Sequence, residues 1–122
     1  MKIAVTSTGP TLDDNVDARF GRCAYFLIID TETMDFDVIE NQSVSTAGGA
    51  GINSAKTVID AGADAVITSN CGPNAERTLT ASGISIYTSV KGTVKEAVEA
   101  FKNGKLTQTS GPTVGPNFGA GN

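Results

Sequence analysis

The sequence predicts an α/β domain built on a mixed β-sheet, and two patterns in the 122-residue chain carry this prediction. In the second half, short apolar runs alternate with segments of helical periodicity, which is typical of parallel strands joined by right-handed crossovers. In the first half, two strand-like runs follow one another closely, as in an antiparallel hairpin. Together with the opening strand, these patterns give five strands, some parallel and some antiparallel.

The first three predicted strands come before residue 41. Lys2–Ser7 is apolar at its centre and is ended by Gly9 and Pro10. Tyr25–Asp30 is a nearly continuous apolar run, as expected for a strand that is covered on both faces. The third strand, over residues 36–39, is more amphipathic and lies among acidic residues, which suits the edge of a sheet.

The second half contains three predicted helices and two predicted strands. Pro73 stands where the first turn of a helix accepts proline. Thr93 and Glu96 have the spacing of a capping box, and Gly62, Gly83 and Gly104 follow the helical patterns as stops. The helices are expected over residues 52–61, 73–82 and 93–103, and the strands over residues 65–68 and 84–87.

The domain is predicted to occupy residues 1–106, which is long enough to bury a core without disulfide staples. Residues 107–122 are rich in Gly, Pro and Thr and carry no charged side chain. Such a segment has little apolar surface to bury, so we expect a mobile tail.

Composition excludes several classes of function. The net charge of −4 argues against a nucleic-acid partner, which needs a basic face. The chain has no histidine, so histidine general-base catalysis is excluded. Its two cysteines are too few for a disulfide framework. The chain begins in a strand pattern and has no apolar run long enough for a bilayer, so we expect a cytoplasmic protein without a membrane partner.

The candidate site lies beyond the carboxyl ends of the parallel strands, where open α/β sheets bind their ligands. Three glycine-containing segments meet helix starts there: Gly48-Gly49-Ala50-Gly51, Gly72-Pro73 and Gly92-Thr93. Backbone N–H groups and the helix dipole make each start a candidate anion site. Ordinary turn chemistry explains each segment taken singly, so the prediction of an anion site depends on their convergence at one edge.

Arg19 and Arg22 flank Phe20-Gly21 in a polar loop that runs into the second strand. The apolar strand fixes the end of this loop, so both cations are expected beside the same edge of the sheet. They would there neutralise a compact anion. The alternative is that the arginines are surface charges paired with the acidic residues of the same loop, which are Asp13, Asp14 and Asp17.

Cys71 lies in the segment Asn70-Cys71-Gly72-Pro73-Asn74, immediately before a predicted helix. A thiol in this position can have a lowered pKa, which favours the thiolate as a nucleophile or a metal ligand. The alternative is a small buried hydrophobic residue. Cys23, at the start of a core strand, is expected to pack. No acidic residue lies on the first strand, which argues against a metal-dependent nuclease of the ribonuclease H type.

Taken together, the loop around Arg19, the glycine segments, the Tyr25-Phe26 pair and residues 101–106 resemble the dinitrogenase iron–molybdenum cofactor biosynthesis family. This family includes nitrogenase accessory factors and the orange-protein branch of sulfate reducers. The resemblance implies a three-layer ribonuclease H-like α/β fold, in which helices cover both faces of a five-stranded mixed sheet. It also implies a binding role, with no catalytic residues.

Members of this family bind or carry molybdenum-containing metal–sulfur clusters, either iron–molybdenum cofactor or a molybdenum–copper sulfide cluster held without covalent bonds. Many members have histidine, which can coordinate a metal, where this chain has Arg19. Arginine cannot coordinate a metal, so we expect ionic contacts and hydrogen bonds to hold the cluster. A cofactor-receiving or assembly protein is the implied partner. Cys71 is also a candidate metal ligand. The expected cofactor-binding residues are Arg19, Phe20, Gly21, Arg22, Gly48, Gly49, Ala50, Gly51, Asn70, Cys71, Gly72, Pro73 and Asn74.

Two alternatives from other classes stay open. The same edge would suit a sensor or an enzyme that binds a phosphorylated metabolite or a nucleotide, because helix starts bind phosphate. The acidic hairpin over residues 30–40 would suit an interaction module that docks another protein.

Overall fold

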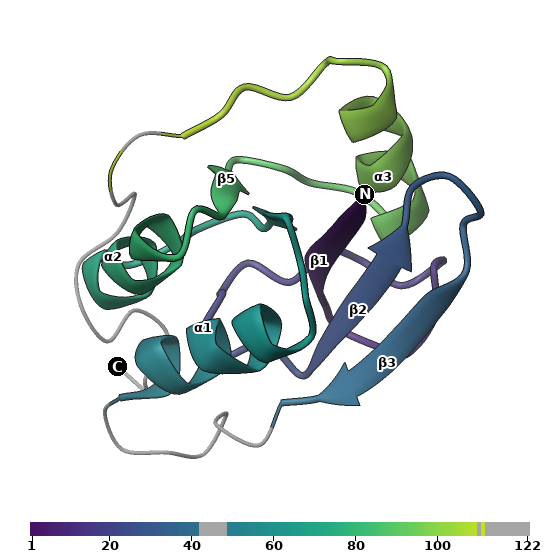
Figure 1. Ribbon diagram of the computed structural model, residues 1–122. Helices are drawn as coiled ribbons and strands as arrows, with labels where there is room; N and C mark the ends of the chain where they lie inside the picture. The colour runs from purple at the N-terminus through teal and green to yellow at the C-terminus, as the bar shows by residue number, and fades with distance from the viewer. Residues whose placement is uncertain (42–48, 110, 112–122) are drawn as a thin grey trace.

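The computed structural model describes residues 1–41, 49–109 and 111. Its sheet has five strands in the order β3-β2-β1-β4-β5 (Figure 1). β2 pairs antiparallel with both β1 and β3, whereas β4 pairs parallel with both β1 and β5. The mixed sheet predicted from the sequence is therefore confirmed. The strands are β1 Lys2–Ser7, β2 Tyr25–Asp30, β3 Phe36–Glu40, β4 Ala65–Ile67 and β5 Ser85–Tyr87.

Three helices cover the two faces of the sheet, which makes three layers. They are α1 Ala50–Asp60, α2 Pro73–Ala81 and α3 Val94–Lys102. α1 and α2 pack on one face and α3 packs on the other (Figure 1). The predicted α/β fold with helices on both faces is confirmed. Among the residues that the structure describes, no helix is long and apolar enough to cross a membrane.

The central strand β1 shows how the sequence divides the core between the two faces. Successive side chains of a strand point to opposite faces. Ala4 therefore joins the cluster under α1 and α2, whereas Ile3 and Val5 join the cluster under α3. All three are buried. Phe20 and Phe26 belong to the same cluster as Ala4.

α1 begins two residues earlier than its apolar pattern predicts. Gly49 is the N-cap and has a left-handed backbone with φ of 72°, which glycine adopts without steric cost. Ala50 and Gly51 therefore form the first turn of α1 and are not part of a loop, and Ala50 is buried. Ile52, which the sequence assigns to the inward face, is 36% exposed.

The end of the described chain extends the sheet region beyond residue 106. Gln108 forms a bridge to Tyr87, and the Thr109 N–H donates to the Ile86 carbonyl at 2.7 Å. The Thr88 N–H also donates to the Thr109 hydroxyl at 3.1 Å. These two residues, which the sequence assigns to a mobile tail, thus pair along the outer edge of β5. The prediction for residues 110 and 112–122 lies outside the described residues.

Candidate functional site

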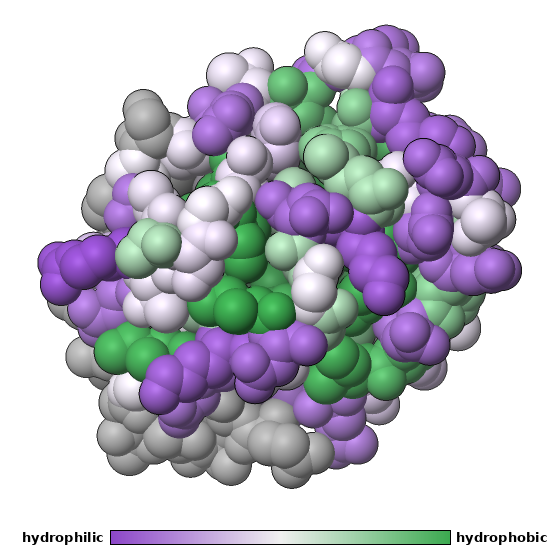
Figure 2. All heavy atoms as spheres, in the orientation of Figure 1, coloured by the Kyte–Doolittle hydropathy of each residue, from purple (hydrophilic) through white to green (hydrophobic). Residues whose placement is uncertain are grey.

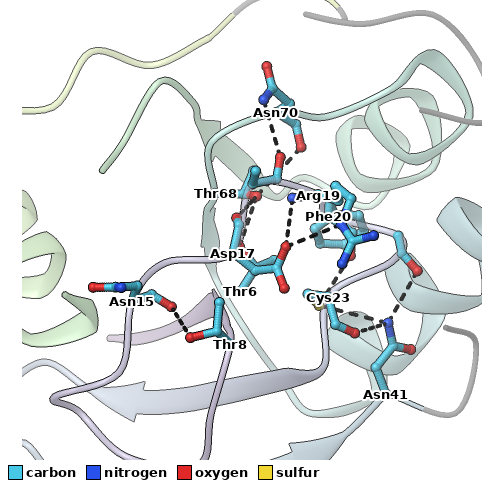
Figure 3. Close-up of polar contacts among 12 residues, drawn as sticks. Thr6, Thr8, Asn15, Asp17, Arg19, Phe20, Cys23, Asn41, Thr68 and Asn70 are labelled. Atoms are coloured by element: carbon cyan, nitrogen blue, oxygen red, sulfur yellow. Dashed lines mark hydrogen bonds and ion pairs between the residues drawn. The ribbon is translucent and has the colours of Figure 1, made fainter. Parts of the chain in front are cut away.

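Buried threonines attach the arginine loop to the carboxyl ends of β1 and β4 (Figure 3). The Thr6 hydroxyl lies 2.9 Å from the Asp17 carbonyl oxygen and 2.9 Å from the Thr68 hydroxyl. The Asp17 N–H donates to the Thr6 carbonyl at 2.9 Å. Both threonines are fully buried, so these contacts are shielded from water and fix where the loop begins.

Asn70 attaches the middle of the same loop. The Phe20 N–H donates to the Asn70 carbonyl at 3.2 Å, and the Asn70 side-chain amide donates to the Ala18 carbonyl at 3.2 Å. Arg19 and Asn70 form a parallel bridge. Two predicted site segments that lie far apart in the sequence therefore run side by side at this edge of the sheet.

Phe20 is a core residue and not a surface contact. Only 2% of it is exposed, and its ring centroid lies 5.6 Å from that of Phe26 in a tilted arrangement. Such aromatic pairs prefer offset or edge-to-face geometry. Phe20 therefore anchors the loop in the hydrophobic core under α1 and α2.

The two arginines have different environments. The Arg19 side chain is 40% exposed, and its Nε lies 3.5 Å from Asp17 Oδ1. The Arg19 N–H also donates to that oxygen, at 3.1 Å. The alternative prediction, that an acidic residue of the loop pairs with an arginine, is thus confirmed for Arg19 and Asp17. Arg22 is buried, so Arg19 presents the more accessible guanidinium of the two.

The Gly21 carbonyl accepts hydrogen bonds from two buried side chains that no pattern in the sequence singles out. The Asn41 side-chain amide and the Ser54 hydroxyl each donate to it at 3.2 Å. Asn41 also donates to the Cys23 carbonyl at 2.9 Å. The available signals were weak: Asn41 is a polar residue directly after a strand, and Ser54 lies one residue before the buried Ala55 on α1.

The first turn of α1 rests directly on the arginine loop. A Cβ atom built on Gly21 would lie 3.0 Å from the Gly51 nitrogen and 3.1 Å from its Cα. A Cβ atom on Gly51 would in turn lie 3.4 Å from the Ala75 Cβ, in ordinary contact with α2. The loop, the start of α1 and the start of α2 therefore meet at one place, which confirms that these predicted segments converge.

Replacing Gly21 with alanine tests this close approach. The new methyl group would press on backbone atoms of α1, so we expect a loss of about 1–3 kcal/mol in the free energy of unfolding, as for other overpacked sites. The matched control is Gly51→Ala, which has room for its methyl group and gains helix propensity. Urea denaturation measures both variants. Equal stability of Gly21→Ala and the parent protein would contradict the close contact.

α1 and α2 both begin after a glycine, whose backbone is left-handed before α1 and extended before α2. Their N-caps are Gly49 and Gly72, and neither start has a side-chain capping hydrogen bond among the described residues. Pro73 occupies the first turn of α2, as predicted. Of the remaining predicted residues, Asn74 is exposed and Gly72 is half-buried. Gly48 lies outside the described residues.

The start of α3 is not an anion site, so that prediction was wrong. Its first three N–H groups donate to the Asp14 carbonyl at 2.8 Å, the Leu12 carbonyl at 2.9 Å and the Thr93 hydroxyl at 3.1 Å. The predicted capping box of Thr93 and Glu96 is confirmed, and its hydrogen bonds hold the pKa of Glu96 below its ordinary value. Every donor that would face an anion at this start already has a partner within the protein.

Cys71 is buried, with 1% of it exposed. Burial disfavours the thiolate and, with a smaller contribution from the nearby Glu76, raises the pKa of Cys71 to about 12. The structure therefore supports the alternative prediction, that Cys71 is a small buried hydrophobic residue. Burial likewise raises the pKa of Cys23. In the described part of the chain, no group of three or more His, Cys, Asp or Glu side chains could hold a metal ion.

Both thiols should consequently resist alkylation in the folded protein. The thiolate is the reactive species, and neither cysteine exposes more than 1% of its surface. We expect iodoacetamide at neutral pH to modify neither residue until urea unfolds the chain, as measured by intact-protein mass spectrometry. Rapid modification of Cys71 in the native state would show that its thiol is accessible and ionised.

The fold and the site define a class of protein: an α/β domain with an open mixed sheet, which gathers an arginine loop and two glycine-capped helix starts at one edge. Residues 1–104 match the family described as dinitrogenase iron-molybdenum cofactor. The chain belongs to this family. The resemblance seen in the sequence is thereby confirmed.

Three known proteins illustrate the relationship. An uncharacterized protein of Methanocaldococcus jannaschii is 31% identical over 109 residues, which cover 87% of this chain and 89% of that protein. The apo form of the orange protein from Desulfovibrio gigas has a similar structure, with a TM-score of 0.90, 38% identity and coverage of 93% of this chain and 96% of the other. A Thermotoga protein of the DUF35 family has a TM-score of 0.78 and 35% identity, with coverage of 93% and 98%.

Proposed function

We propose that this protein binds and carries an anionic molybdenum-containing metal–sulfur cluster as cargo and does not act as an enzyme. The observation that carries the proposal is the gathering of Arg19 and the starts of α1 and α2 at one edge of the sheet. Membership of the iron–molybdenum cofactor family and the likeness to the orange protein support a cluster as the ligand. A molybdenum–copper sulfide cluster suits the site best, because it can be held without covalent bonds.

Arg19 is the residue best suited to neutralise such a cluster. Its ion pair with Asp17 is made through Nε, whereas a guanidinium has five N–H donors in all. The pair therefore orients the group and leaves further donors for a second anion. Arg22, which is buried within the same loop, adds positive charge from within the fold.

The starts of α1 and α2 supply the remaining favourable interactions. A helix start directs N–H groups and the positive end of the dipole at an anion, and each contact contributes about 0.3–1 kcal/mol. Gly49 and Gly72 bring no side chain that would compete for these N–H groups. Only 1% of Cys71 is exposed, so its thiol is not presented at the surface of this edge, and we assign the binding to charge and hydrogen bonds.

The test is a titration of tetrathiomolybdate and copper into Arg19→Gln. We expect this variant to bind the cluster about tenfold more weakly or worse, which corresponds to the loss of one charge-assisted hydrogen bond. The control is Lys105→Gln, which removes one positive charge from an exposed position after α3, on the other side of the sheet. Equal affinity of the parent protein and Arg19→Gln would refute the proposed role of Arg19.

A second candidate rests on the same helix starts, because glycine-capped starts also bind phosphate. It predicts that a phosphorylated metabolite or a nucleotide raises the melting temperature. A thermal-shift panel of inorganic phosphate, nucleotides and sugar phosphates would separate the two candidates. Under the cluster proposal these compounds do not change the melting temperature. We further propose that the protein acts in the cytoplasm beside an assembly or cofactor-receiving protein.

A further inference from the structure

The hydrogen bonds on either side of β3 show which of its residues direct their backbone groups away from β2. The Asp30 N–H donates to the Asp35 carbonyl at 2.9 Å just before β3, and the Asn41 N–H donates to the Ala24 carbonyl at 3.0 Å just after it. In an antiparallel pair, hydrogen-bonded and non-bonded positions alternate along each strand. Every second residue of β3 therefore directs its backbone N–H and C=O away from β2. These outward residues are Phe36, Val38 and Glu40.

The same residues also expose apolar side chains. Phe36 lies opposite Ile29 and Val38 lies opposite Leu27, so both project on the face that α3 covers further in. Ile29 and Leu27 are fully buried, whereas Phe36 is 37% exposed and Val38 is 42% exposed. Figure 2 shows hydrophobic atoms at the surface over β3, bordered by hydrophilic atoms. Exposed backbone groups and exposed apolar side chains thus coincide on one edge.

The charge of this edge indicates what it would accept. Residues 30–40 contain five acidic side chains and no Lys or Arg. A second copy of the chain would bring two such acidic sets together, and like charges on paired strands are destabilising. Acidic residues alone would be explained as protection of an edge strand against aggregation, but that purpose does not explain two exposed apolar side chains on it. The acidic residues are Asp30, Glu32, Asp35, Asp37 and Glu40.

We infer that β3 is a docking edge for an extended segment of another protein, in which apolar residues alternate with Lys or Arg. The segment would add to the sheet as a sixth strand and bond to the outward backbone groups of β3. Its apolar side chains would cover Phe36 and Val38, and its basic side chains would lie on the opposite face, near Asp35 and Asp37. This inference does not depend on cluster binding.

The test uses a synthetic peptide of alternating lysine and valine and the isotope-labelled apo protein in an NMR titration. We expect the amide shifts to change along Phe36–Glu40, and the amide exchange of those residues to slow. A peptide of alternating glutamate and valine has the same apolar residues and the opposite charge, and it should not bind. Asp35→Asn together with Asp37→Asn should weaken binding of the lysine peptide and leave the fold intact.

A proline in β3 separates strand addition from simple charge attraction. The Val38 N–H points away from β2, so Val38→Pro removes a donor that makes no hydrogen bond among the described residues, and it blocks the added strand. We expect about tenfold weaker binding or none, as after loss of a strand hydrogen bond and its neighbours. Arg19→Gln should bind the peptide like the parent protein. Unchanged shifts, equal binding of the glutamate peptide, or a dimer that protects the β3 amides would each overturn the inference.

Discussion

Replacing Phe20 with alanine is expected to lower the free energy of unfolding by about 3–5 kcal/mol. Phe20 is 2% exposed and packs against Phe26 in the cluster under α1 and α2, so truncation leaves a cavity that the close-packed core cannot readily fill. Equilibrium denaturation in urea measures the loss. The cluster site should weaken as well, because Phe20 lies between Arg19 and Gly21 and anchors the loop that carries both.

The matched control is Phe36→Ala, which makes the same change on the exposed edge of the sheet. Phe36 is 37% exposed, so its replacement should lower the free energy of unfolding by less than about 1 kcal/mol, as is usual for surface substitutions. Phe20→Leu keeps most of the buried volume, so its stability should lie between those of Phe20→Ala and Phe36→Ala. If Phe20→Ala kept the stability of the parent protein and lost cluster binding alone, Phe20 would be a ligand contact and not a core anchor.

Asn41→Asp is expected to destabilise the protein by about 1–3 kcal/mol or more, although the two side chains have the same shape. Asn41 is 3% exposed, and its amide donates to the carbonyls of Gly21 and Cys23. An ionised carboxylate in its place has no donor and faces two carbonyl oxygens. Urea denaturation at several pH values measures the effect.

The pH dependence distinguishes this explanation from a general loss of packing. Burial raises the pKa of the new carboxyl group, so the folded state binds its proton more tightly than the unfolded state does. The penalty should therefore shrink as the pH falls, since the protonated acid regains one donor. Asn74→Asp is the control, because Asn74 is exposed in the first turn of α2 and an added carboxylate there is tolerated. A penalty that did not change with pH would contradict this explanation.

The sequence was sufficient for those features that depend on neighbours in the chain. The apolar runs at Lys2–Ser7 and Tyr25–Asp30 and the capping box at Thr93 all predicted elements that the structure contains. Proline at the first turn of α2 did the same. Each of these signals is local, since periodicity and capping involve residues within a few positions of one another.

The site could be predicted only in part, because its supports come from distant positions. The hydroxyls of Thr6 and Thr68 meet across 62 residues, and no local pattern marks either of them. Burial also changed the chemistry: a helix start suggested a lowered pKa for Cys71, but the packed core around it raises that pKa. The sequence at the start of α3 is typical of an anion site, but carbonyls of the loop over residues 11–16 accept hydrogen bonds from its N–H groups.

We propose that this protein carries a molybdenum-containing metal–sulfur cluster. The most direct measurement is the visible absorption spectrum of protein isolated anaerobically without chelators, together with elemental analysis for Mo, Cu, Fe and S. We predict charge-transfer bands and stoichiometric molybdenum, accompanied by copper. A colourless, metal-free protein that also fails to bind added tetrathiomolybdate and copper would contradict the claim.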